Sequence, residues 1–524
     1  MMTIVMKALT TDLALSGAGL RVSSKTRAHL RLLATAGLLF ALFCAGLAFV
    51  QYGAAGLVGN DGYYHMKMGY LMRAQGLKPP FSYLPFTILN EAAFYDHHML
   101  YHAYLALFAG LDPALDGGAS LTQGAKVASI VLPALAFLAA WWLLRRRNVP
   151  YAAVWSLGLL AVSEPFLYRM SMPRAQSASL LLLFLGLYLL LQGRHKWLLP
   201  LGAVYVWTYN GFPLLMVIAG VYVAATWLLH REFAWKALAY AGLGILLGLL
   251  VNPYFPANIE FIAGHLAPKV GQSTTPVGNE WSPYRTWTLV ENSGPALVAF
   301  LLAILALGWR RDRIDRDALV ALGLTAAFGL MLLSSRRFVE YFPPFVLIFL
   351  AFSAAPLLRD WQAQWARRRT PTQVVLPLLA VGLLAYATFV TLGDARELVA
   401  RSKAPDHYAA AALWLRETAG DDLRLFQTDW DDFTRLFFYG GRATYTAGLD
   451  PTFMELHDPD LFAEWVAITR GRVDQPSALI RDRFGANYVF SDLNHDDFLQ
   501  EATADPGLQE IYRDEYAVIF ALRP

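Results

Sequence analysis

The chain contains repeated apolar runs that are long enough to cross a membrane. A spanning helix needs about 20 apolar residues, and hydropathy predicts eleven candidate runs here, of which 197–209 is short for a span. They lie at residues 31–50, 121–144, 150–166, 177–193, 197–209, 212–229, 235–252, 293–309, 318–334, 344–358 and 373–392. A missed pair of helices would raise the count, so the pattern predicts an α-helical polytopic membrane protein with about 11–13 transmembrane helices.

The composition supports a membrane protein. Hydrophobic residues make up 56% of the 524 residues and charged residues only 16%, whereas a soluble domain carries about 25% charged residues. This balance excludes an ordinary cytosolic enzyme and a disordered protein. The one cysteine, Cys44, excludes an intrachain disulfide and a cysteine-based zinc site.

The loops between the apolar runs alternate between two kinds. Short basic loops lie at residues 145–147, 194–196, 230–236, 310–316 and 359–369, and longer mixed loops lie at 51–120, 167–176, 253–292 and 335–343. Because Lys and Arg resist translocation, the basic loops are expected in the cytoplasm. This places the N-terminal segment 1–30 in the cytoplasm of a cell with an inner (plasma) membrane, and the long first loop 51–120 and the C-terminal tail outside it, in the periplasm.

The tail differs in charge from the rest of the chain. Residues 393–524 hold 24 Asp and Glu against 13 Lys and Arg, a net charge of −11, so residues 1–392 carry +14. Apolar patterns in the tail predict helices at 408–420 and 477–485 and strands at 424–428, 487–492 and 517–522. We therefore expect a transmembrane domain over 31–392 and an extracytoplasmic soluble α/β domain over 393–524.

Two external clusters in the first long loop carry acids or histidines. Asp61 in GNDGYYHM could ligate a divalent cation or orient an acceptor, or could simply cap the helix that follows. Asp96, His98 and His102 stand in DHHMLYH, where the two histidines share one helix face and could bind a metal together. Carboxylate ligands would favour Mg²⁺ or Mn²⁺. The alternative without a metal is an interfacial helix whose histidines face water.

Two further external clusters carry an acid and several arginines. Glu280 lies in a polar, proline-bounded loop that could act as a mobile lid, or could be a solvated surface glutamate. Arg336 and Arg337 lie at the outer end of a predicted span, where a cation needs a partner or an anionic ligand. A lipid phosphate or pyrophosphate suits guanidinium groups, and Arg169 and Arg174 raise the same possibility on another external loop.

The sequence disfavours several functional classes because it lacks the motifs and charges that they need. The sequence has no Walker A pattern, no HExxH and no GxSxG, which disfavours an ATP-driven pump. Few charges fall within the predicted spans, which weakens a proton-coupled transporter. The basic loops are too short and scattered to bind nucleic acid.

In this order, the clusters resemble motifs of the GT-C superfamily of polytopic glycosyltransferases, most closely the single-subunit bacterial and archaeal forms of the oligosaccharyltransferase catalytic subunit. Asp61 matches the aspartate of the family's first external loop, and Glu280 in VGNEWSPYRTW matches its mobile-loop glutamate. YVWTYNGFPLL (205–215) is similar to its aromatic helix hairpin, and Arg337 in RFVEYFPP matches its late arginine. TDWDDFTRLFFYGG places Trp430 and Asp431 on the end of its W-W-D motif.

The resemblance implies an enzyme of the EC 2.4 class. Such an enzyme moves a sugar or oligosaccharide from a polyprenyl phosphate or pyrophosphate donor to a protein, lipid or polysaccharide acceptor on the extracytoplasmic side. It implies a divalent cation, Mg or Mn, with Asp61 and Glu280 catalytic and among its ligands, and we expect Asp96 and His98 to complete the ligand set. Arg336, Arg337 and Arg174 would bind the donor phosphate, and Trp430 and Asp431 the acceptor.

The chain also departs from the family pattern. Its second external loop, EPFLYRMSMPRAQSASLL, has no acid where the family has a D-x-D or D-x-H pair, and Asp429 stands in place of the first Trp of W-W-D. Asp96 and the histidines beside it could replace the missing pair chemically. The departures keep open a non-catalytic alternative, a transporter or scaffold for lipid-linked saccharides in envelope assembly.

Overall fold

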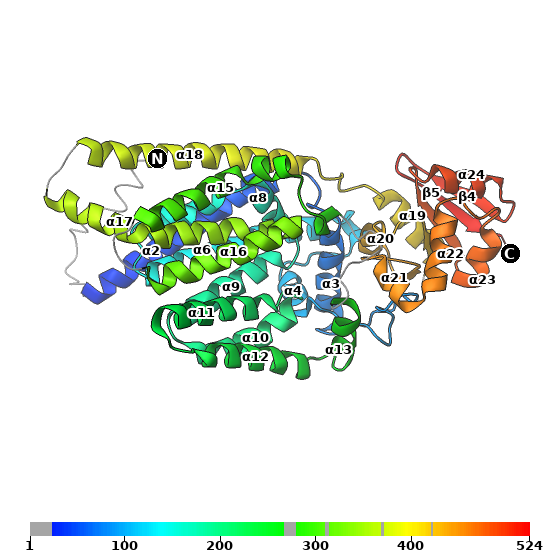
Figure 1. The fold of residues 1–524 in the computed structure, drawn as a ribbon. Helices are drawn as coiled ribbons and strands as arrows, with labels where there is room; N and C mark the ends of the chain where they lie inside the picture. The colour runs from blue at the N-terminus through cyan, green and yellow to red at the C-terminus, as the bar shows by residue number, and fades with distance from the viewer. Residues whose placement is uncertain (1–23, 267–278, 310–313, 368–370, 421–422, 524) are drawn as a thin grey trace.

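The computed structural model describes residues 24–266, 279–309, 314–367, 371–420 and 423–523. A long bundle of helices is joined at one end to a smaller α/β part formed by the end of the chain (Figure 1). Most of the segment 1–30 lies outside the described residues, as do parts of the loops 253–292, 310–316 and 359–369.

Six helices of the described residues are long and apolar enough to cross a membrane. They are α2 (Ser24–Gln51), α6 (Ala119–Arg146), α15 (Thr286–Trp309), α16 (Arg316–Ser334), α17 (Phe342–Arg367) and α18 (Pro371–Ala400). The pair α8 (Glu164–Ser171) and α9 (Gln176–Leu191), bent by 109°, makes a seventh if it is counted as one span. Three shorter helices complete the bundle: α10 (Leu198–Thr208), α11 (Leu214–His230) and α12 (Trp235–Leu250). The prediction of a polytopic helical membrane protein is confirmed.

The run at 150–166 is not one continuous helix, which corrects the prediction of a single helix there. It folds as α7 (Ala152–Leu157), the short helix η1 (Gly158–Leu160) and the start of α8. Ser163 adopts an extended conformation and its hydroxyl accepts a hydrogen bond from Phe166 N, with Pro165 in the first turn of α8. A capping serine followed by proline starts a new helix. Every other predicted run coincides with a single helix.

The first long loop is largely structured and buried. It contains α3 (Asp61–Gln75), α4 (Met99–Ala106) and α5 (Pro113–Asp116). In α3 almost every side chain from Gly62 to Met72 is buried, because the helix lies between the bundle and the α/β part (Figure 1). The candidate residues of this loop are therefore held on a packed helix.

The α/β part is built on a five-stranded mixed sheet of order β2-β1-β3-β5-β4. β1 (Leu423–Gln427) runs parallel to β2 (Ala443–Tyr445) and β3 (Tyr488–Asp492), and β5 (Ala517–Leu522) runs antiparallel to β3 and β4 (Leu508–Arg513). The helices around the sheet are α19 (Ala409–Ala419), α20 (Phe433–Tyr439), α21 (Thr452–His457), α22 (Pro459–Thr469), α23 (Ser477–Phe484) and α24 (Asp496–Ala504). The predicted helices and strands of the tail are confirmed, whereas the short β2 and the polar β4 were not predicted.

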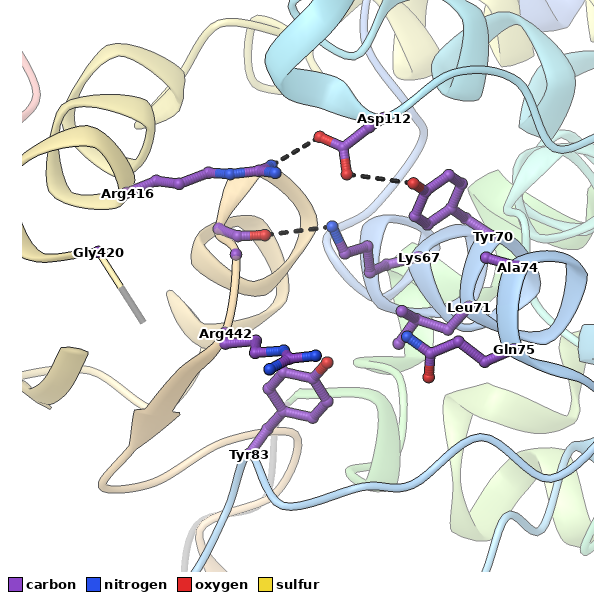
Figure 2. Close-up of a pocket in the computed structure, with 12 residues that line it drawn as sticks. Lys67, Tyr70, Leu71, Ala74, Gln75, Tyr83, Asp112, Arg416, Gly420 and Arg442 are labelled. Atoms are coloured by element: carbon purple, nitrogen blue, oxygen red, sulfur yellow. Dashed lines mark hydrogen bonds and ion pairs between the residues drawn. The ribbon is translucent and has the colours of Figure 1, made fainter. Parts of the chain in front are cut away.

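Helix α20 joins the α/β part to α3. The ring of Phe438 packs edge-on against Tyr63 at 5.1 Å, and the Lys67 ammonium donates to the carbonyls of Phe438 and Gly440 at 3.1 and 3.2 Å. Burial lowers the pKa of Lys67 to about 8. Beside Lys67 lies a cavity of about 340 Å³, where the exposed Arg442 faces Tyr83 (Figure 2).

The same cavity wall carries an ion pair between the two parts. Arg416 Nη1 donates to Asp112 Oδ1 at 2.6 Å, and the other oxygen of Asp112 accepts from Tyr70 (Figure 2). Aromatic packing, carbonyl contacts and this pair fix the α/β part against the first long loop.

A small residue sets the spacing of one helix pair in the bundle. A Cβ added at Gly244 of α12 would lie 2.3 Å from the Leu199 carbonyl oxygen of α10, and close helix contact in membranes depends on such small residues. Gly244→Val is therefore expected to destabilise the α10–α12 pair and lower the melting temperature in detergent. Gly220→Val in α11, where a Cβ meets nothing within 4 Å, is the matched control. Equal melting temperatures for the two variants would contradict this packing.

Candidate active site

Asp61 is the first residue of α3, and its carboxylate faces the guanidinium group of Arg174. Its carboxylate Oδ2 lies 3.0 Å from Arg174 Nη2, and its side chain keeps 31% of its surface exposed. The residue before it, Asn60, occupies the cap position of α3 without a side-chain capping bond. The Asp61 carboxylate is therefore directed into the site by the start of a buried helix.

Arg174 reaches the site from the turn between α8 and α9. This turn packs so closely on α3 that a Cβ added at Gly62 would lie 2.6 Å from the Pro173 ring. Glycine after Asp61 thus lets the turn approach the acid. Arg174 also contacts Glu280 Oε2 through Nη1 at 3.2 Å, so its guanidinium bridges the two predicted catalytic acids.

The carboxylate of Glu280 contacts three guanidinium groups. Arg169 Nη1 lies 2.7 Å from Oε2 and Arg337 Nη1 lies 3.6 Å from Oε1, in addition to Arg174. The Ser335 hydroxyl donates to the Glu280 carbonyl at 2.9 Å and holds the backbone there. Burial by itself would raise the pKa of Glu280, but the cations of Arg174, Arg337 and Arg169 outweigh it and hold the pKa well below its usual value.

A second acid lies beneath Arg169. Glu340 is fully buried, and its Oε1 accepts from Arg169 Nε at 2.8 Å and also pairs with Nη2. Its Oε2 has no hydrogen-bond partner among the described residues. Three arginines and three acids therefore form a charge-balanced network. Within it Arg169 is only 10% exposed, whereas Arg174 and Arg337 are 18% and 20% exposed.

The two neighbouring arginines 336 and 337 have different surroundings. Arg337 Nη2 donates to the Tyr209 hydroxyl at 2.7 Å, and its guanidinium lies over the Trp281 ring at 5.0 Å. Arg336 is directed away and donates to the carbonyls of Ser282 and Pro283, both at 3.2 Å. Arg337 thus lies in the charged network, and Arg336 holds the loop that follows Glu280.

The histidines of the first loop form a separate cluster with one residue that sequence reasoning missed. His102 Nδ1 bonds to Asp96 Oδ2 at 2.8 Å, and its Nε2 lies 2.8 Å from Nδ1 of His65. Asp96 Oδ1 accepts from the His98 backbone N–H at 2.9 Å. One feature of the sequence could have identified His65 as a candidate site residue. It lies one helical turn after Asp61 and on the same helix face.

The four predicted metal ligands do not meet at one point. Asp61 and Glu280 both bind Arg174, and Asp96 binds His102 and the His98 backbone. The reason is Arg174, whose positive charge stands between the two acids. Among the described residues the one group of His, Cys, Asp or Glu close enough to hold a metal is His65, His98 and His102.

The α/β part brings Asp431 next to the site. Asn60 Nδ2 donates to Asp431 Oδ2 at 2.5 Å, and the partly exposed Trp430 precedes it in the turn after β1. Burial, followed by the charge of Asp61, raises the pKa of Asp431. Asp431 therefore lies next to the start of α3, on the side of the α/β part.

A cavity of about 290 Å³ opens beside Asn60. Its lining includes Arg401, Lys403 and Arg435, and no carboxylate from the part of the chain that the structure describes. Arg435 is buried, lies over the Tyr63 ring at 4.2 Å and donates to the Ala404 carbonyl at 2.8 Å. Three cationic side chains therefore line the cavity beside Asn60.

Comparison with known proteins identifies the fold. No protein-family profile and no curated protein sequence matches the chain. Among solved structures, the oligosaccharyltransferase AglB of Archaeoglobus fulgidus, in complex with an inhibitory peptide and a dolichol-phosphate, matches with a TM-score of 0.64 at 12% identity, covering 94% of this chain and 74% of AglB. A complex of the A. fulgidus oligosaccharyltransferase with Zn and sulfate matches with a TM-score of 0.58 at 11% identity, covering 92% and 73%.

ArnT of Cupriavidus metallidurans bound to undecaprenyl phosphate matches with a TM-score of 0.57 at 17% identity, covering 92% of this chain and 97% of ArnT. These likenesses show that the chain has the GT-C fold of membrane glycosyltransferases. The resemblance noted in the sequence motifs is confirmed at the level of the fold. Two different kinds of GT-C protein match with similar scores, so the fold by itself does not select the acceptor.

Proposed function

We propose that the protein is a membrane glycosyltransferase that moves a sugar or oligosaccharide from a polyprenyl phosphate or pyrophosphate donor to an acceptor. The observation that carries the proposal is the convergence of Asp61 and Glu280 on Arg174 at the end of the bundle that faces the α/β part. The positive-inside pattern of the loops supports placing this end on the extracytoplasmic side of the inner membrane.

In the proposed reaction the acceptor attacks the anomeric carbon of the sugar. The bond between that carbon and the phosphate oxygen breaks, and the electron pair leaves with the polyprenyl phosphate. Asp61 orients the acceptor and takes its proton. Arg174 and Arg337, the two more exposed arginines of the network, bind the phosphate oxygens and neutralise the charge that develops on them.

Glu280 and Arg169 have positioning roles in this proposal. Glu280 holds the three guanidinium groups in one place, and Arg169 is fixed by Glu340 beneath it. Trp430 and Asp431 support an acceptor site, since Asp431 is hydrogen bonded to Asn60 beside the acid. The cations of the adjoining cavity favour an acceptor that carries a negative charge.

A single Mg or Mn ion held by Asp61, Asp96, His98 and Glu280 does not fit this arrangement. Oδ2 of Asp61 and Oε2 of Glu280 are paired with Arg174, and the oxygens of Asp96 are hydrogen bonded to His102 and the His98 backbone. In the proposed mechanism the arginines therefore supply the positive charge at the phosphate.

The test is transfer by the purified full chain in lipid vesicles. Labelled polyprenyl monophosphate and pyrophosphate sugars are offered with candidate protein, lipid and polysaccharide acceptors. Glu280→Ala is expected to reduce transfer by about 10²- to 10³-fold, as loss of one preorganised electrostatic group does in other enzymes. Glu291→Ala, at an exposed position of α15, is the control. A Glu280→Ala variant with full transfer would refute the proposal.

A second candidate is a non-catalytic transporter or scaffold for lipid-linked saccharides. The observation that favours it is Arg174 itself, which lies in the loop where related glycosyltransferases are expected to carry an acid pair. This alternative predicts that the protein binds polyprenyl-linked sugars and that no sugar reaches any acceptor. Binding that Asp61→Ala leaves unchanged, together with no transfer by the unaltered protein, would support it.

A further inference from the structure

The proposed transfer reaction leaves the histidine cluster of the first loop unused. His65 comes from α3, His102 from α4, and His98 from the residue immediately before α4. His65 and His102 are buried with 4% and 0% of their surfaces exposed, and Asp96 is 2% exposed. His98 is half-buried beside them, and each buried polar group in such a cluster needs a partner.

The hydrogen bond to Asp96 orients the His102 ring. If Nδ1 of His102 donates to Asp96 Oδ2, the lone pair of Nε2 is directed at His65 Nδ1, 2.8 Å away. This carboxylate–imidazole pair is the arrangement that holds metal-binding histidines in a fixed tautomer and orientation. Asp96 is thus placed as an outer partner of His102, and its own oxygens are occupied.

The third imidazole completes a ligand set. Nδ1 of His98 is buried without a hydrogen-bond partner among the described residues. One nitrogen from each of the three histidines lies within 4.8 Å of the others.

We propose that His65, His98 and His102 bind one divalent transition-metal ion of the zinc class, with Asp96 as the outer carboxylate that orients His102. Imidazole nitrogens suit zinc, copper, iron and nickel, whereas Mg and Mn prefer oxygen ligands. A tetrahedral zinc ion with bonds of about 2.0–2.1 Å places its ligands about 3.3–3.4 Å apart. His65 and His102 need only separate slightly from their contact at 2.8 Å to meet this spacing.

The ion would tie α3 to α4 one helical turn below Asp61. Its three protein ligands leave a fourth position free, as in zinc sites that accept a water or substrate oxygen. His98 also stacks on the Tyr209 ring at 5.7 Å, and Tyr209 accepts a hydrogen bond from Arg337. The metal site is thus connected to the charged network through one aromatic side chain, and its existence does not depend on the proposed transfer reaction.

The experiment measures metal directly on the full chain purified in detergent. After removal of bound metal by a chelator, the protein is titrated with Zn²⁺ and, separately, with Co²⁺ as a spectroscopic probe. One equivalent of zinc is expected, and the cobalt form is expected to show the intense visible absorption of a tetrahedral site. Asp96→Asn is expected to weaken the affinity by about 10- to 100-fold, as loss of an outer carboxylate does elsewhere.

The variants separate a metal site from a purely hydrogen-bonded cluster. His98→Ala removes a ligand whose Nδ1 makes no hydrogen bond to any described residue, so it is expected to fold and to lose metal binding. His97→Ala, one residue away and stacked on Phe261, is the matched control and is expected to keep it. Asp61→Ala is expected to keep the metal while losing transfer. The proposal is overturned if the unaltered protein binds neither metal stoichiometrically, or if His98→Ala binds zinc as tightly as His97→Ala.

Discussion

Replacing Asp61 by asparagine is expected to lower the transfer rate by about 10²- to 10⁴-fold, the usual contribution of a general base. Asparagine keeps the size of the side chain but cannot take the acceptor proton. It also removes the charge that faces Arg174 at 3.0 Å. The measurement is the initial rate at saturating acceptor with varied donor, where kcat should fall and the KM for the donor should change little.

The control for Asp61 is an aspartate outside the charged network. Asp406 is exposed near the junction with the α/β part, and Asp406→Asn is expected to leave the rate within about twofold, because surface substitutions away from special features have small effects. Comparable melting temperatures for the two variants would show that the loss is chemical. An Asp61→Asn enzyme within threefold of the unaltered rate would remove Asp61 from the mechanism.

Replacing Arg169 by leucine is expected to destabilise the protein by about 3 to 5 kcal/mol, the cost of leaving one charge of a buried pair without its partner. Glu340 is 0% exposed and its Oε2 has no other partner among the described residues, so Arg169 supplies its compensation. The measurement is unfolding in detergent followed by intrinsic fluorescence.

The double variant Arg169→Leu/Glu340→Gln distinguishes this cause from a general packing defect. Removing both charges is expected to recover more than half of the lost stability, since the penalty comes from the unpaired carboxylate. Arg336→Leu is the matched control, because its guanidinium binds loop carbonyls and, among the described residues, no carboxylate. If the double variant is no more stable than Arg169→Leu, the buried pair is not the source of the effect.

Much of the fold follows from local patterns along the chain. Ten of the eleven predicted apolar runs each coincide with one bundle helix, because a helix in lipid needs only a continuous apolar segment. The prediction of one helix over 150–166 was wrong because Ser163 and Pro165 begin a new helix inside this run. In the tail, β2 was missed because it has only three residues, and β4 because its charged side chains hide the strand pattern.

The candidate site was only partly predictable. Asp61, Glu280, Arg174 and Arg337 were each recognised as unusual charges near the membrane, and they are neighbours in the structure. The sequence pattern indicated Arg169 as a candidate phosphate ligand but gave no partner for it, and it did not indicate Glu340 at all. Their pairing needs α8 to pack beside the segment Arg336–Glu340, which no local pattern indicates.

The sequence by itself determined the membrane architecture, the acidic α/β tail and the residue types available for chemistry, because these depend on local composition and periodicity. Only the tertiary structure decided which charges face one another. It placed the guanidinium of Arg174 between Asp61 and Glu280, and it brought His65 to His98 and His102. Contacts between side chains from distant segments depend on how helices pack and turn, and spacing along the chain does not record that geometry.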